Sequence, residues 1–166
     1  PSTNYRGYYF AVNSAKKVIV ILRSTISDRF YFISTTDINT SQWYHIAFTY
    51  DGTATASGGN IYINGIADSL TTSGTLLGTM ESTDQLYLGS RDDSDNWING
   101  NLDEISIFNT ELTQANVTTI FNGGVPNDIN ALSPLSWWRA EQVTFDGADW
   151  TLIDQGSGGN NGLSSS

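Results

Sequence analysis

The residues best suited to chemistry lie in one acidic loop, R-D-D-S-D-N-W-I-N-G, at residues 91–100. Its side chains include hard oxygen donors of the kind that calcium prefers, and the candidates for ligand binding are Asp92, Asp93, Asp95 and Asn96. An EF-hand that starts at Asp93 is excluded, because Ile98 stands where that loop needs glycine and because strands are expected on both sides. We therefore expect either a solvated acidic turn or a ligand or calcium contact of another kind.

Trp97 is a large aromatic side chain in the middle of this polar loop. Such a ring can stack on a sugar or anchor a protein contact, since tryptophan is enriched at the energetic centres of interfaces. It can equally fold back as a lid over the domain. Trp97 completes a candidate ligand-binding set with the four oxygen donors of the loop, and both readings of its role stay open.

The residue types for nucleophilic catalysis are missing or isolated. His45 is the single histidine and lies among aromatic residues in W-Y-H-I-A-F, whereas a serine-type triad needs it beside a hydroxyl and a carboxylate. The chain has no cysteine, which excludes cysteine nucleophiles and zinc–thiolate sites. We expect a structural or surface-facing histidine and no enzymatic activity.

Charge and length restrict the partners. The 166 residues include seventeen acids against seven Lys and Arg, and the net charge is −10. Phosphate recognition needs clustered cations, and only the pair Lys16-Lys17 occurs, so we expect no nucleic acid partner. The longest apolar run, 18–22, is too short to cross a bilayer, so we expect no membrane insertion.

Short alternating segments predict an all-β fold of one domain with antiparallel strands. Strands are expected at 5–12, 17–23, 29–34, 43–50, 61–63, 66–70, 85–89 and 102–108. One helix is expected near 113–122, with Thr113 as its N-cap and Gly123-Gly124 as a left-handed stop. Asn64-Gly65 between apolar residues predicts a tight hairpin.

The strand at 43–50 has one face that is suited to the core. This face carries Tyr44, Ile46, Phe48 and Tyr50.

After Pro126 the composition of the chain changes. Residues 137–154 hold three of the five tryptophans, and a Gly/Ser-rich tail follows that should be mobile unless a neighbour holds it.

Four motifs in order carry a family resemblance: W-Y-H-I-A-F-T-Y-D-G at 43–52, G-G-N-I-Y-I-N-G at 58–65, L-Y-L-G at 86–89 and I-N-G-N-L-D-E-I-S-I-F-N-T-E-L-T at 98–113. This combination resembles the laminin-G-like, pentraxin-like branch of the concanavalin A-like lectin/glucanase superfamily. The resemblance implies a two-sheet antiparallel jelly-roll sandwich over residues 1–125. Residues 126–166 would then form an aromatic-rich extension and tail.

The usual opening segment of that family does not precede Pro1, so its N-terminal strands are expected to be missing or permuted. A similar segment stands at the C-terminus instead, as W-W-R-A-E at 137–141 followed by D-Q-G-S-G-G-N-N-G at 154–162. Either a second repeat starts there or the sandwich is completed in permuted order. We expect the chain to be a piece of a longer polypeptide, and we expect 137–154 to fill an open edge near 5–12, within one chain or by exchange between subunits.

The resemblance also implies where catalytic or metal-binding carboxylates would lie. Glucanase relatives carry a pair on one strand as E-x-D-x-x-E, which is absent, and the neighbours Asp103 and Glu104 should point to opposite faces of a strand. A glycoside hydrolase is therefore the weakest alternative. In the resembled superfamily a carboxylate at the position of Asp103 often joins a structural calcium site, so Asp103 is the candidate metal ligand and Ca²⁺ the candidate cofactor.

The function we expect is a non-enzymatic binding or decoration module of a larger extracellular or virion-surface protein. Its partners would be a capsid, fibre or other surface protein assembly, copies of itself, or glycans. The alternative is a carbohydrate-binding lectin domain of a secreted or cell-surface adhesin. The tail also resembles modules of bacteriophage virion proteins, which favours the first reading.

Overall fold

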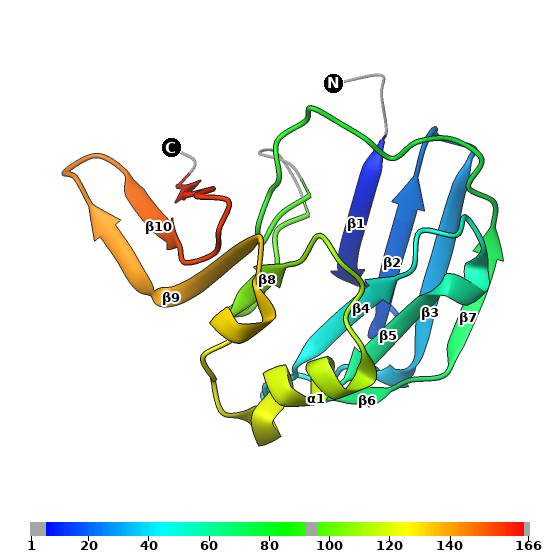
Figure 1. Ribbon diagram of the computed structural model, residues 1–166, viewed down its shortest axis with the longest axis horizontal. Helices are drawn as coiled ribbons and strands as arrows, with labels where there is room; N and C mark the ends of the chain where they lie inside the picture. The colour runs from blue at the N-terminus through cyan, green and yellow to red at the C-terminus, as the bar shows by residue number, and fades with distance from the viewer. Residues whose placement is uncertain (1–5, 92–95, 165–166) are drawn as a thin grey trace. The chain divides into compact units, whose positions relative to one another are not determined.

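The alternating segments form three antiparallel sheets and one α-helix in the computed structural model, which describes residues 6–91 and 96–164 (Figure 1). The chain divides into two compact units. Unit 1 comprises Pro1–Asp84 and Glu111–Val125, and unit 2 comprises Gln85–Thr110 and Pro126–Ser166. Residues 85–110 group with the C-terminal segment in this division, and the domain boundary expected at residue 125 stays a prediction.

The larger sheet of unit 1 has the strand order β1-β2-β3-β7. Its strands are β1 Gly7–Val12, β2 Lys17–Arg23, β3 Arg29–Asp37 and β7 Leu70–Gly74. The alternation predicted for β2 and β3 is confirmed: Val18, Val20 and Leu22 on β2, with Phe30 and Phe32 on β3, are nearly fully buried. β1 lies at the edge and pairs with β2.

The second sheet of unit 1 has the order β4-β5-β6. Its strands are β4 Ile46–Tyr50, β5 Gly59–Ile63 and β6 Ile66–Ala67. The predicted core face of 43–50 is confirmed, because Tyr44, Ile46, Phe48 and Tyr50 pack against the buried cluster of the larger sheet. Phe32 of β3 lies 5.1 Å from Phe48, measured between ring centroids, so the two sheets pack face to face.

The predicted hairpin turn and the predicted helix start in unit 1 are both confirmed. Asn64 and Gly65 have φ of 51° and 75°, and Ile63 pairs with Ile66, as a two-residue hairpin loop of this handedness requires. Helix α1, Gln114–Phe121, starts with a capping box between Thr113 and Asn116. Its left-handed cap is Asn122, one residue before the predicted glycine stop.

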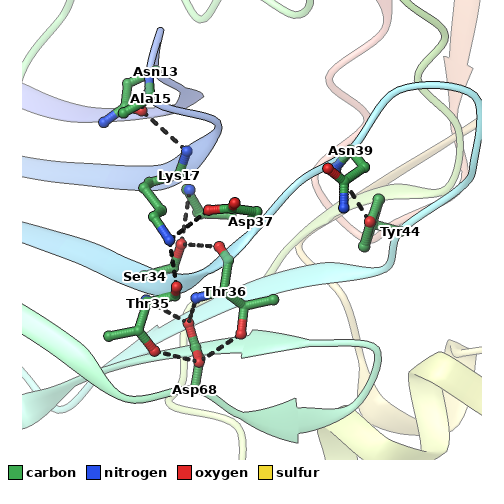
Figure 2. A network of polar contacts seen from close by, with 11 residues as sticks. Asn13, Ala15, Lys17, Ser34, Thr35, Thr36, Asp37, Asn39, Tyr44 and Asp68 are labelled. Atoms are coloured by element: carbon green, nitrogen blue, oxygen red, sulfur yellow. Dashed lines mark hydrogen bonds and ion pairs between the residues drawn. The ribbon is translucent and has the colours of Figure 1, made fainter.

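Asp68 interrupts the predicted strand 66–70 and separates β6 from β7. Its carboxylate accepts hydrogen bonds from the backbone N–H and the hydroxyl of both Thr35 and Thr36 (Figure 2). Burial alone would raise the pKa of Asp68, but these bonds together lower it. Beside it, Lys17 pairs with Asp37 and donates to the Thr35 carbonyl, so the end of β3 is held by charged side chains.

Unit 2 contains a sheet of order β11-β10-β9-β8. Its strands are β8 Ile105–Ile107, β9 Ser136–Phe145, β10 Trp150–Asp154 and β11 Gly162–Leu163. The predicted strand 85–89 is wrong, since this segment is irregular; its side chains Leu86, Tyr87 and Leu88 are 46%, 37% and 36% exposed, without the covered face that stabilises a strand. The predicted strand 102–108 shortens to β8.

Asp154 organises the turn that follows β10. Its Oδ1 accepts from the backbone N–H of Trp137 and Gly156, both at 2.8 Å, and its Oδ2 accepts from Asn160 N at 2.7 Å. Gly158 N also donates to Leu135 O at 2.7 Å. The Gly/Ser-rich tail is thus held by neighbours as far as β11.

The segment 137–154 forms strands of the unit 2 sheet. Residues 136–138 of β9 pair with β8, and residues 138 and 143–145 pair with β10. Trp137 and Trp138 are 3% and 4% exposed. The expectation that 137–154 fills an open edge near 5–12, within one chain or by exchange between subunits, stays a prediction.

Candidate functional site

The acidic loop is described only in part. Asp92, Asp93 and Asp95 lie outside the described residues. Asn96 has a positive φ of 56°, and the Trp97 side chain is 58% exposed. Ile98 N donates to Gly89 O at 2.7 Å. The Trp97 side chain is presented to solvent, as a stacking or anchoring side chain requires.

A cluster of charged and aromatic side chains surrounds Glu104. Its Oε2 accepts from Trp137 Nε1 at 2.7 Å, and its Oε1 accepts from Arg139 Nε at 2.9 Å. The guanidinium of Arg139 also pairs with Glu141 at 2.7 Å and stacks over the Trp137 ring, 5.1 Å from its centroid. The hydrogen bond that Arg139 donates to Glu104 and the negative charge of Glu104 raise the pKa of Arg139.

Asp103 lies beside this cluster. Its Oδ1 accepts from Glu104 N at 2.8 Å and from Ala140 N at 2.9 Å, so the carboxylate ties β9 to the segment before β8. Oxygen atoms of Asp103, Glu104 and Glu141 lie within 4.8 Å of one another. The expectation that Asp103 and Glu104 point apart is wrong. Glu104 has a φ of 54° and precedes the strand, so the two-residue alternation does not apply to it.

This acidic cluster could hold a divalent cation, since carboxylate oxygens suit calcium. However, Arg139 already bonds Glu104 and Glu141, and both oxygens of Glu104 have donors. A cation would have to displace the guanidinium. The same arrangement argues against glycoside hydrolysis at this cluster, because a substrate would have to replace Arg139 between Glu104 and Glu141.

His45 does not have the surroundings of a catalytic base. Its Nδ1 is buried and, among the described residues, has no hydrogen-bond partner, whereas a triad needs a carboxylate there. Burial lowers the pKa of His45, which favours the neutral ring. The imidazole lies 5.8 Å from the Phe121 ring of α1, between centroids, and its role is packing.

β1 carries an apolar row that sequence reasoning did not single out. Directly opposite residues on antiparallel strands point to the same face of a sheet, and Tyr8, Phe10 and Val12 lie opposite Leu22, Val20 and Val18. The β2 residues are at most 4% exposed, but the β1 row is 57%, 46% and 45% exposed. The core-facing side of the sheet is thus only partly covered along its edge strand. The apolar residues at alternating positions 8, 10 and 12 were the sequence signal from which this row could have been predicted.

A second apolar row lies on the β9–β10 hairpin. Phe145 pairs with Trp150 and Val143 pairs with Leu152, so these four side chains share one face. Phe145 and Trp150 are each 53% exposed, and their ring centroids are 4.8 Å apart. Notably, residues 139–145 of β9 extend beyond its pairing with β8, whose ladder covers 136–138.

One open hollow of about 300 Å³ is lined by Arg6 and residues 81–84. Its walls mix one cation with acidic and hydroxyl side chains. Small-molecule sites are usually concave and mainly apolar. We assign no ligand to this hollow.

No helix among the described residues is long and apolar enough to span a membrane.

Comparison with known proteins agrees with the fold. The family model Laminin_G_3, described as the Concanavalin A-like lectin/glucanases superfamily, matches residues 1–118. A search of the curated proteins found no match. Among solved structures, the chain is similar to a crystal structure of an S-layer domain-containing protein from Clostridium thermocellum, with 18% identity and a TM-score of 0.38. The match covers 69% of this chain and 60% of that chain, less than two thirds of the latter.

Proposed function

Because the chain belongs to the laminin G family of the Concanavalin A-like lectin/glucanases superfamily, we propose that it is a non-enzymatic binding or decoration module of a larger extracellular or virion-surface structural protein. It attaches that protein to a protein assembly, to a glycan, or to both. The family supplies the lectin-like sandwich, and the exposed side chains of this chain supply the attachment.

The observation that carries the proposal is the uncovered row on β1. Tyr8, Phe10 and Val12 occupy the face of the sheet that is buried on β2 and β3, yet about half of each side chain is exposed. Contiguous exposed apolar surface of this kind marks interaction sites in soluble proteins. The alternation along β1 shows that the row belongs to a defined face of the sheet.

The charged cluster supports a binding role over hydrolysis. A retaining glycosidase needs two carboxylates on either side of a substrate, with room for the glycosidic bond between them. Here the guanidinium of Arg139 bonds both Glu104 and Glu141. We expect no release of reducing sugar from any polysaccharide, and release that disappears with Glu104→Gln would contradict the proposal.

The test of attachment is co-sedimentation of the purified chain with insoluble cellulose, chitin and bacterial cell walls, combined with a measurement of self-association. Retention or self-association that falls several-fold in Phe10→Ser supports the proposal. Leu77→Ser is the matched control, because Leu77 is 87% exposed and lies outside the β1 row. Absence of both retention and self-association at protein concentrations up to about 1 mM would overturn it.

The alternative function is a lectin domain of a secreted or cell-surface adhesin. The observation that favours it is the exposed Trp97 in the acidic loop, next to Asn96. If the chain is a lectin domain, we expect the wild-type chain to bind to an array of neutral and acidic oligosaccharides. Trp97→Ala should abolish this binding, and Phe10→Ser should keep it. The opposite pattern of the two variants separates the two functions.

Calcium at Asp103 is part of the proposal. Asp103, Glu104 and Glu141 supply clustered oxygens, and a cation that binds only the folded chain raises its melting temperature. The measurement is a melting curve with calcium and with chelator. Identical curves would remove calcium from the function.

A further inference from the structure

We propose that the β9–β10 hairpin of one copy of this chain docks along the β1 edge of a second copy. The inference rests on the proposed function and names its partner: another copy of the chain. It is carried by three properties of the two surfaces, namely their open strand edges, their apolar rows and their opposite charges.

The first property is the pair of open edges. Among the described residues, β1 pairs with β2 alone, so the N–H and C=O groups of its outer side have no strand beside them. β9 pairs with β8 only over residues 136–138, and Ala140 N donates to Asp103, so among the described residues the outer side of 141–145 is without a strand. An exposed edge accepts an added strand through main-chain hydrogen bonds.

The second property is the pair of apolar rows. On β1, Tyr8 and Phe10 are 57% and 46% exposed. On the hairpin, Val143, Phe145 and Trp150 are 42%, 53% and 53% exposed. Each row lies on one face of its own strand, since its residues alternate with the two-residue period. Strand addition would cover both rows together.

The third property is charge. Residues 6–29 contain five cations and one acid, on a chain whose net charge is −10. Residues 140–154 contain four acids and no Lys or Arg: Glu141, Asp146, Asp149 and Asp154. Asp154 is buried in its own turn and Glu141 pairs with Arg139, which leaves Asp146 and Asp149 for an interface. Potentials of opposite sign steer such surfaces together and fix their register.

The charges also match in position. Arg6 precedes β1 and Arg23 pairs with its first residue, whereas Lys16 and Lys17 follow its last residue across the hairpin. On β9, Glu141 and Asp146 bracket the exposed segment. At about 3.3 Å per residue, both the basic and the acidic groups are separated by about 17–20 Å. One strand can therefore lie along the other with Asp146 near a cation, while Lys17 and Glu141 already pair with Asp37 and Arg139 in their own chain.

The contact is heterologous, because the β9–β10 hairpin of one copy meets the β1 edge of the next. Such contacts continue from copy to copy and form open arrays unless a rotation closes them. A single hairpin buries less surface than a stable complex needs, so we expect dissociation constants of about 1 µM to 1 mM for one contact. Repetition on a surface would then provide avidity.

The test uses cysteine pairs, because the chain has no cysteine of its own. Phe10→Cys and Phe145→Cys chains are mixed under mild oxidation and separated on a non-reducing gel. A heterodimer that forms at least tenfold faster than with Leu77→Cys and Phe145→Cys supports the inference. Yields equal to this control, or closure of the Phe10→Cys/Phe145→Cys double variant within one chain at every concentration, would overturn it.

A charge exchange tests register without relying on apolar side chains. Lys16→Glu/Lys17→Glu and Glu141→Lys/Asp146→Lys chains should each self-associate at least tenfold more weakly than the wild type, and an equimolar mixture should recover association. Unchanged association in both variants would contradict the inference. Retention on cell walls by chains that stay monomeric would refute this inference and leave the proposed function standing.

Discussion

The interior of unit 1 and the interior of unit 2 are stabilised by different kinds of interaction. In unit 1 two sheets bury a continuous apolar cluster, in which Val18, Phe32 and Ile61 are fully excluded from solvent. In unit 2 the small sheet buries Trp137 and Trp138, and much of its remaining order comes from carboxylates that accept hydrogen bonds. Apolar burial follows a sequence period, whereas polar contacts depend on where individual side chains end up.

The largest effect should come from the core of unit 1. Phe32→Ala removes a ring that contacts Phe30, Phe48 and Tyr50, and we expect a loss of about 3–5 kcal/mol in the free energy of unfolding. Phe10→Ala, on the exposed row of β1, should cost about 1 kcal/mol or less. Urea denaturation measures both. Equal losses would show that β1 is covered.

The next effect should come from the polar turn of unit 2. Asp154→Ala leaves the N–H groups of Trp137, Gly156 and Asn160 without their acceptor, and each buried donor left unpaired costs about 1–3 kcal/mol. Amide hydrogen exchange should accelerate at these three positions. Asp128→Ala is the control, because its carboxylate accepts one exposed hydrogen bond from Asn130 N. Unchanged exchange in Asp154→Ala would contradict the role of this turn.

A smaller effect concerns calcium. Arg139→Ala removes the cation that bonds Glu104 and Glu141 and leaves three carboxylates close together. Like charges at this separation repel, so a calcium ion should bind more tightly than to the wild type and raise the melting temperature more. Titration of the melting temperature with calcium measures the difference. A response no larger than that of the wild type would exclude a cation at this cluster.

The smallest effect is the pH dependence of unit 1. Burial lowers the pKa of His45, so the unfolded chain binds a proton more readily than the folded chain. This contribution to stability is present above the unfolded pKa of about 6.5 and is lost as the pH falls below it toward the lower folded pKa. His45→Phe should reduce the slope of melting temperature against pH between pH 5 and 7. An unchanged slope would show that other groups cause it.

Much of unit 1 could be predicted from the sequence. The alternation of Ile46, Phe48 and Tyr50 identifies one core face, and Asn64-Gly65 identifies the hairpin, because both depend on residues adjacent in the chain. The capping role of Thr113 is local in the same way. The Laminin_G_3 match then placed these elements in one superfamily.

The candidate sites were less predictable. The position of Glu104 beside Asp103 depends on a single left-handed residue, which the two-residue period cannot indicate. The segment 85–89 has the composition of a strand, but a strand also needs a partner, and no pairing forms for it among the described residues. The exposure of the β1 row depends on what does not pack against it, and a pattern of apolar residues cannot show this.

Sedimentation velocity over rising protein concentration tests most directly whether the uncovered row of β1 is a binding surface. The weight-average sedimentation coefficient of the wild-type chain and of Leu77→Ser should increase with concentration, and that of Phe10→Ser should stay at the monomer value. A wild-type chain that remains monomeric up to about 1 mM, or a Phe10→Ser variant that associates like the wild type, would contradict the assembly of this module through β1.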